Sequence, residues 1–282
     1  MGEKSMVSLE YLLHFIDEDA PSGDVTSEAV IPDIRCRAEI SAEQSGIIAG
    51  LCEATMLFSH YEVAVEQFVQ DGQTVKTGDK LLRLSGDAKK ILLVERTALN
   101  IIGRMSGIAT QTREMADIIY KKNPQCRIAG TRKTCPGFRA LDKKAVQLGG
   151  GEPHRGNLSD GILIKDNHLA LVSLKKAITD AKKITLYKKI EVEVETPADA
   201  LLAASAGADI ILLDNMNPGQ VKITLDALIK NCLRDHVIIE ISGNITQNTL
   251  SDFADLGVDV ISMGALTHTV KNFSVKLEII PG

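Results

Sequence analysis

The second half of the chain alternates short apolar stretches with segments of helical periodicity. Strands separated by helices in this way favour parallel βαβ units. The predicted strands lie at residues 190–196, 208–215, 236–242 and 258–265, and the last three end at or near Asp214, Ser242 and Gly264. The carboxyl ends of parallel strands carry the chemistry both in α/β barrels and in open doubly wound sheets. These ends therefore mark a candidate site without choosing between the two architectures.

The first third of the chain has a different pattern. Residues 7–18 have helical periodicity, and residues 62–88 alternate apolar and polar positions around Asp-Gly and Thr-Gly turns. Such alternation broken by glycine turns is typical of β-hairpins. Residues 89–122 then continue as one long helical pattern. We therefore predict a mixed α/β unit that is followed by a long helix.

The strand predicted at residues 190–196 carries three acidic residues in alternation. Glu191, Glu193 and Glu195 alternate with valines, so all three carboxylates should point to one face of the strand. One interpretation is a strand with a solvated face. Parallel strands are normally covered on both faces, however, and a covered carboxylate needs a cation, a metal ion or a hydrogen-bond network. We favour a functional face, with Glu193 as its strongest candidate.

Positive charge gathers in the middle of an otherwise acidic chain. The 282 residues have a net charge of −5, yet residues 127–168 contain eight Lys or Arg against four Asp or Glu. A run of charge often forms only a solvated face. Arg139, Lys143 and Lys144 follow a Pro-Gly pair and fit the exposed face of a helix. The remaining cations stand in glycine-rich loops, where a binding role competes with that interpretation.

Composition excludes several classes of protein. An acidic chain with no Trp, four Tyr and six Phe is not a general nucleic-acid binder, which would show basic stripes interleaved with aromatic residues. No apolar run approaches the roughly 18 residues that a membrane helix needs. The first residues show no export signal, so we expect a cytoplasmic protein. The five cysteines form no C-x-x-C pair, which favours reduced thiols over disulfides or a zinc site.

Six short motifs follow one another in a recognisable order: GTRKTCPGFR, GGGEPHR, LIKDNH, EVEVET, ILLDNM and GALTH. In this order and spacing they resemble the quinolinate phosphoribosyltransferases, also called carboxylating nicotinate-nucleotide pyrophosphorylases. SGDVTSEAVIP and ERTALNIIGRMSGIAT, nearer the start of the chain, also look like that family. The resemblance implies a type II phosphoribosyltransferase fold. An N-terminal α/β sandwich would comprise residues 1–113 with the tail 269–282 returning to it, and residues 114–268 would form an open, seven-stranded α/β barrel.

The resemblance also implies a reaction that explains the local positive charge. The phosphoribosyl group of phosphoribosyl pyrophosphate would pass to quinolinate with loss of CO₂, giving nicotinate mononucleotide and pyrophosphate for NAD biosynthesis. Both substrates are polyanions, so a shared cleft needs fixed cations. Arginine suits the carboxylates because its planar fork donates two hydrogen bonds, while lysine acts as a mobile point charge. Mg²⁺ is the implied cofactor.

By the same resemblance, individual residues take roles. The residues placed around the substrates are Arg132, Lys133, His154, Arg155 and Lys165. The implied catalytic set is Lys133, Lys165, Glu193 and Asp214, of which the two acids would also bind Mg²⁺. The positions that match the phosphate-binding loops are Ser242, Gly243, Asn244, Gly264 and Ala265. Arg96 would reach the active site of a neighbouring subunit in a homodimer, with further association of dimers left open.

Three departures from the family pattern leave the acceptor substrate open. Pro153 stands where the family has Asn, Ser159 replaces a Tyr, and Asn244 replaces a Gly and could narrow the phosphate loop. ModD-like phosphoribosyltransferase homologues linked to molybdate transport are the first alternative, but they commonly lack the lysine that this chain keeps as Lys165. The second alternative is a non-catalytic, anion-binding dimer. In such a dimer the predicted acidic pair would only repel the ligand.

Overall fold

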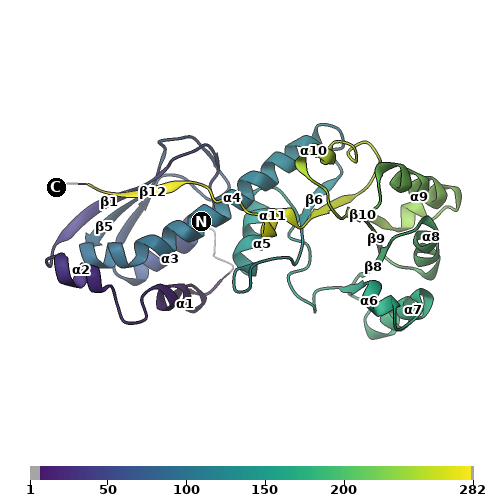
Figure 1. Ribbon diagram of the computed structural model, residues 1–282, viewed down its shortest axis with the longest axis horizontal. Coiled ribbons are helices and arrows are strands. Elements are labelled where there is room, and N and C mark those ends of the chain that lie inside the picture. The colour runs from purple at the N-terminus through teal and green to yellow at the C-terminus, as the bar shows by residue number, and fades with distance from the viewer. Residues whose placement is uncertain (1–6, 281–282) are drawn as a thin grey trace. The chain divides into compact units, whose positions relative to one another are not determined.

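The chain forms two units, each with its own hydrophobic core, in a computed structural model that describes residues 7–280 (Figure 1). The predicted domain ends at residues 1–6 and 281–282 lie outside the described residues. The first unit comprises the described residues up to Arg113 together with Thr134–Gly150 and the chain from Thr269 onward. The second unit comprises Glu114–Lys133 and Gly151–His268. Among the described residues, no helix has both the length and the apolar character to cross a membrane.

The first unit is built on an antiparallel sheet. Within residues 7–280, its four strands follow the order β12-β1-β5-β3, and the tail predicted to return to this unit forms β12. Alternate residues of β1 (Arg35–Ala42) are buried, as the period of a strand with one covered face requires. The other strands of the unit are β2 (Gly46–Ile47), β3 (Ala64–Gln67), β4 (Thr74–Val75), β5 (Lys80–Asp87) and β12 (Val275–Ile280). The predicted hairpin at residues 62–88 contains β3 and β5, which pair antiparallel.

Helices complete the core of the first unit. The helices are α1 (Leu9–Asp19), α2 (Val25–Val30), α3 (Leu51–His60), α4 (Ala88–Tyr120) and α5 (Arg139–Leu148). Helices α1, α3, α4 and α5 contribute buried apolar side chains to one cluster with the sheet, and α2 does not. The long predicted helix is α4, and the boundary between the units falls within it, after residue 113.

Helix α5 belongs to the first unit, whereas the sequence analysis placed residues 134–150 with the barrel. Leu141, Ala145 and Val146 are buried in the core of the first unit. The Asp142 carboxylate, which is fully buried, accepts hydrogen bonds from the Arg104 guanidinium at 2.8 and 2.9 Å. These apolar and ionic contacts hold the segment against α4 and its neighbours.

The expectation of an exposed cationic face on α5 is wrong for two of its three residues. Lys143 and Lys144 are only 4% and 6% exposed. The Lys144 ammonium donates to both oxygens of Glu53, at 2.9 and 3.1 Å, and lies 3.4 Å from an oxygen of Asp71. Asp71 in turn accepts from the first backbone N–H groups of α3. A lysine charge at this position is buried because two buried carboxylates compensate it.

The second unit is built on a parallel sheet. In the described part of the chain it has six strands, in the order β6-β11-β10-β9-β8-β7, so β6 and β7 form its two edges. The strands are β6 (Arg127–Gly130), β7 (Ile162–Ile164), β8 (Ile190–Val194), β9 (Ile210–Asp214), β10 (Ile238–Ser242) and β11 (Val260–Met263). The remaining helices are α6 (Asp166–Leu169), α7 (Leu174–Ile184), α8 (Pro197–Ala206), α9 (Pro218–Lys230), the 3₁₀ turn Arg234–His236, α10 (Gln247–Leu250) and α11 (Ala265–His268).

The seventh strand of the predicted barrel is reduced to a single bridge. Glu152 forms an isolated parallel bridge with Ala129 of β6, on the edge that faces away from β11. Three glycines precede Glu152, and Pro153 follows it without a backbone N–H to donate. The glycines before Glu152 make the chain too flexible, and Pro153 after it lacks a hydrogen-bond donor, so the bridge does not extend into a strand. The sheet therefore stays open, as predicted, but with one strand fewer than predicted.

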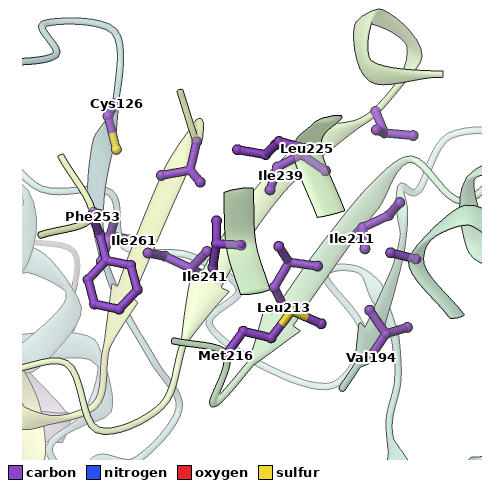
Figure 2. Packing of buried hydrophobic residues seen from close by; sticks show 14 of the residues in the cluster. Cys126, Val194, Ile211, Leu213, Met216, Leu225, Ile239, Ile241, Phe253 and Ile261 are labelled. Atoms are coloured by element: carbon purple, nitrogen blue, oxygen red, sulfur yellow. The ribbon is translucent and has the colours of Figure 1, made fainter. Parts of the chain in front are cut away.

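The two faces of the parallel sheet differ in chemistry. One face carries isoleucine, leucine and valine side chains that share a hydrophobic cluster with residues of the helices, as Figure 2 shows for Ile211, Leu213 and Ile241 together with Leu225 of α9. Because side chains alternate along each strand, the residues between these positions project from the opposite face. That second face carries Glu193, with its neighbours described below.

Candidate functional site

Side chains of the second sheet face line a cavity of about 530 Å³ in the second unit. Strand register places them in rows: Glu193 of β8 is opposite Leu212 of β9, which is opposite Glu240 of β10. One step further along, Asp214 is opposite Ser242. All five residues line the cavity. The polar positions at the carboxyl ends of the predicted strands therefore meet at one place.

Most of the predicted site residues line this cavity. The residues that do so are Arg132, Lys133, His154, Arg155, Lys165, Glu193, Asp214, Ser242, Gly243 and Asn244. Gly264 and Ala265 are not among the lining residues, although a Cβ at Gly264 would lie 3.0 Å from Cδ of Lys133. Arg96 is an exposed residue of α4 in the first unit. Its predicted role at a neighbouring subunit stays a prediction.

Two arginines contribute to the positive charge of the cavity, together with Lys133 and Lys165. Arg132 follows β6, and its Nε is buried without a hydrogen-bond partner among the described residues. Burial and the nearby charge of Arg132 lower the pKa of Arg155 from its ordinary value. A buried donor without a partner beside a second guanidinium is unfavourable. A bound anion with several acceptor oxygens would relieve both costs.

A histidine lies between two buried carboxylates in the same cavity. His154 Nε2 is 3.3 Å from an oxygen of Glu240 and 3.6 Å from an oxygen of Glu191, and both acids are at most 5% exposed. Burial, followed by the charge of Glu240, raises the pKa of Glu191 to about 7, and the other oxygen of this carboxyl has no hydrogen-bond partner in the described part of the chain. The backbone of His154 is left-handed, with φ of 56°.

The acids around His154 were only partly anticipated by the sequence. Glu191 was predicted to share the face of Glu193, and it does, whereas Glu195 lies beyond the end of β8 and is exposed. Glu240 was missed, although the same alternation within IIEIS could have identified it. His154, Glu191 and Glu240 each place one potential metal-ligating atom within 4.8 Å of the others. The positive charges of Arg155 and Lys165 also act on Glu191 and lower its pKa against the effect of burial.

A lysine and a glutamate form an ion pair at the end of β8. The Lys165 ammonium donates to Oε2 of Glu193 at 3.1 Å. Its backbone N–H donates to Nδ1 of His168 at 3.0 Å, which fixes the start of the short helix α6. Lys165 is partly exposed, so the pair can separate when a ligand competes for either partner. The predicted cation and the predicted metal ligand are therefore direct neighbours.

Asparagines surround the carboxylate at the end of β9. Oδ2 of Asp214 accepts a hydrogen bond from Nδ2 of Asn215 at 2.7 Å. Oδ1 of Asn215 accepts a hydrogen bond from Nδ2 of Asn244 at 3.1 Å. The backbone N–H of Asn215 donates to the carbonyl of Ser242 at 2.9 Å. Gly243, with φ of 95°, lies against this amide. Asn215 was not singled out in the sequence.

The carboxylates of Glu193 and Asp214 suit a hard divalent cation better than a soft one. Each hydrogen bond or ion pair described above uses one oxygen of each group. Both carboxylates line the cavity. Mg²⁺ is commonly held by one or two carboxylates together with waters and substrate phosphate oxygens, and it does not require a complete protein cage. The donor set present in this chain fits that pattern.

Comparison with known proteins agrees with the motifs. Residues 24–106 and 108–278 match the family models described as the N-terminal and C-terminal domains of quinolinate phosphoribosyl transferase. The chain is 42% identical over 274 residues to a probable carboxylating nicotinate-nucleotide pyrophosphorylase of Methanothermobacter thermautotrophicus, covering 96% of this chain and 98% of that protein. A solved nicotinate-nucleotide pyrophosphorylase from Ehrlichia chaffeensis has a TM-score of 0.92 at 31% identity, covering 98% of this chain and all of that one (100%).

Proposed function

Because the chain belongs to the quinolinate phosphoribosyltransferase family, we propose that it converts quinolinate and phosphoribosyl pyrophosphate to nicotinate mononucleotide, pyrophosphate and CO₂, a step of NAD biosynthesis. One observation carries the proposal beyond family membership. The guanidinium groups of Arg132, whose Nε has no hydrogen-bond partner among the described residues, and of Arg155 line a single cavity with the acidic pair Glu193 and Asp214. A dicarboxylate needs the guanidinium groups, and a metal-bound pyrophosphate needs the acidic pair.

The cations of the cavity would hold the acceptor. Arg132 and Arg155 offer planar donor forks to the two quinolinate carboxylates, and each charge-assisted hydrogen bond contributes roughly 1.5–3 kcal/mol. The Lys165 ammonium would leave Glu193 and turn to the substrate. Lys133 lies in a loop that is fixed by the Thr267 hydroxyl, which donates to the Lys133 carbonyl at 2.9 Å. These contacts would orient the pyridine nitrogen toward the ribose.

The acidic pair would manage the donor. Mg²⁺ bound with Glu193 and Asp214 would neutralise charge that develops on the leaving pyrophosphate. The bond from C1 of the ribose to pyrophosphate breaks while the bond from C1 to the pyridine nitrogen forms. Positive charge grows on the ribose in the transition state, so nearby carboxylates stabilise it. No covalent nucleophile is required, and positioning supplies most of the remaining rate.

Decarboxylation follows on the cationic ring. The bond between the ring and the 2-carboxylate breaks, CO₂ leaves, and the electron pair stays on the ring carbon beside the positive nitrogen. That carbon then takes a proton. The cavity residues contribute by holding the ring while the carboxylate departs.

The wider setting is part of the same proposal. We expect a cytoplasmic homodimer in which Arg96 of α4 contributes a cation to the cavity of the neighbouring subunit. Its exposure on the helix leaves the guanidinium available to a second copy.

The test is product formation from quinolinate, phosphoribosyl pyrophosphate and Mg²⁺, followed as nicotinate mononucleotide by chromatography. Lys165→Ala and Glu193→Ala should abolish turnover. Lys176→Ala should not, because that lysine forms only an exposed pair with Asp180 within α7. A folded protein that is inactive with quinolinate would overturn the proposal. Turnover of nicotinate or another aromatic acid in its place would favour the ModD-like alternative.

A further inference from the structure

We propose that Asn215 is a positioning residue that holds the Asp214 carboxylate in place for phosphoribosyl pyrophosphate, and that Asn244 fixes Asn215 in the orientation this requires. The inference rests on the proposed function. It joins two parts of the cavity that the sequence treats separately: the acidic end of β9 and the loop that follows β10.

Backbone geometry first places Asn215 beside the carboxylate. Its φ is 54°, in the left-handed region, where asparagine is tolerated far better than most residues. Its N–H is held by the carbonyl of Ser242, at the end of the neighbouring strand. The side chain turns back to donate from Nδ2 to Asp214 at 2.7 Å. The main chain therefore directs the exposed Asn215 side chain toward Asp214.

Only one orientation of the Asn215 amide satisfies both of its neighbours. Its NH₂ group must face Asp214, because a carboxylate can only accept a hydrogen bond. Its oxygen then faces Nδ2 of Asn244, which donates at 3.1 Å. A flipped amide would set oxygen against oxygen and nitrogen against nitrogen. The Asp214 carboxylate thus sets the orientation of the Asn215 amide, and the hydrogen bond from Asn244 holds the amide in it.

Gly243 makes the close approach possible. A Cβ at this position would lie 2.2 Å from Oδ1 of Asn215 and 2.8 Å from its backbone nitrogen. Asn244, like Asn215, has a positive φ, of 51°. Residues 243 and 244 are thus shaped around the amide of Asn215. The side chain of Asn244 donates a hydrogen bond to Asn215, and its predicted narrowing of the loop stays a prediction.

The consequence for the ligand is specific. Ser242, Gly243 and Asn244 belong to the loop proposed for the 5′-phosphate, and Asp214 to the site proposed for the ribose and metal-bound pyrophosphate. The amide chain connects the two ends of phosphoribosyl pyrophosphate through protein atoms. Its loss should weaken binding of this substrate while leaving the quinolinate contacts of Arg132 and Arg155 intact.

Glycine substitutions test the inference without straining the backbone, since glycine accepts positive φ freely. The variants are Asn215→Gly, Asn244→Gly, their combination, and Asn215→Asp. Cys232→Gly is the matched control, because Cys232 is an exposed residue with φ of 56° that does not line the cavity. Circular dichroism and thermal unfolding establish that each variant is folded. Calorimetry measures binding of phosphoribosyl pyrophosphate with Mg²⁺, and steady-state kinetics give KM for each substrate.

Asn215→Gly should raise Kd and KM for phosphoribosyl pyrophosphate about 10-fold or more, the usual effect of one hydrogen bond to a charged group, with KM for quinolinate unchanged. Asn244→Gly should have a smaller effect, and the double variant should be no worse than Asn215→Gly, since Asn244 acts through Asn215. Asn215→Asp should be worse than Asn215→Gly because it sets a second carboxylate beside Asp214. If Asn215 had only a structural role, Asn215→Asp, which is nearly isosteric, should be the variant whose Kd and KM for phosphoribosyl pyrophosphate are closest to those of the wild type.

Two failures can be told apart. Additive effects of the two glycine variants, or an Asn215→Asp protein that binds like the wild type, would overturn the positioning role alone. A wild-type protein that neither binds phosphoribosyl pyrophosphate nor consumes quinolinate would overturn the proposed function, and this inference with it.

Discussion

Replacing Lys144 by methionine should destabilise the first unit by about 3–5 kcal/mol, the usual cost of removing one partner from a buried ion pair. Glu53 is fully buried and the side chain of Asp71 is 2% exposed, so neither can recover its hydration once the lysine charge is gone. Methionine keeps most of the volume, so the loss would be electrostatic and not a cavity effect. Urea unfolding measures it, with hydrogen exchange of α3 as a local report on the unit.

The loss of stability in Lys144→Met should also depend on pH. Burial already raises the pKa of Asp71 although Lys144 lowers it, so removing the lysine raises that pKa further. A carboxyl group with a raised pKa in the folded state stabilises the fold when protonated and loses that contribution as pH rises above its unfolded pKa of about 3.9. The deficit of Lys144→Met relative to the wild type should therefore grow as pH rises above the already raised pKa of Asp71 in the folded wild-type protein.

Two comparisons make the reasoning refutable. Lys176→Met removes an exposed ion pair within α7 and should change stability by about 0.5 kcal/mol or less. Adding Glu53→Gln to Lys144→Met removes one uncompensated charge and should restore part of the loss. If Lys144→Met lost less than about 1 kcal/mol at neutral pH, the attraction of Lys144 to Glu53 and Asp71 would not offset the cost of burying the three charges, and the reasoning would be refuted.

Two further predictions concern backbone space and thiol chemistry. Gly243→Ala should reduce kcat/KM by about 100-fold, because its Cβ would collide with the backbone of Asn215 and displace the loop. Gly257→Ala has a similar positive φ but open space around it, so activity should persist with only about 1–2 kcal/mol of backbone strain. Burial raises the pKa of the Cys126 thiol to about 12, so an aromatic disulfide reagent should modify the exposed Cys135 and spare Cys126 until the protein unfolds, as peptide mass mapping would reveal.

Much of the site was readable from the sequence because strand period and strand ends obey simple geometry. Glu193 and Asp214 meet because their strands are neighbours and both residues lie near carboxyl ends. The same rules explain why Glu195 was wrongly predicted to share the face of Glu193. It alternates in step with Glu191 and Glu193, but it lies past the last residue of β8, next to the N-cap of α8. Alternation locates a face, and the length of the strand decides which residues remain on it.

What the sequence could not show depends on contacts between distant segments. Lys144 resembles a surface lysine until Glu53 and Asp71, both more than seventy residues earlier, are brought against it. Asn215 acquires a function only once Asn244 lies beside it, and no local pattern predicts that pairing. The reduced seventh strand depends on a subtler balance, because a glycine run and one proline weaken a pairing that the general fold would allow.

The two-faced parallel sheet has a consequence for how this chain can vary over evolutionary time. Consecutive positions of β8 and β9 answer to different selective pressures: substitutions at Val192 or Leu213 alter folding, and substitutions at Glu193 or Asp214 alter chemistry. A saturation library across these strands should therefore separate into two interleaved classes, one losing abundance and the other losing activity at normal abundance. An insertion or deletion of one residue would exchange the classes, so length in these strands is under stricter constraint than identity.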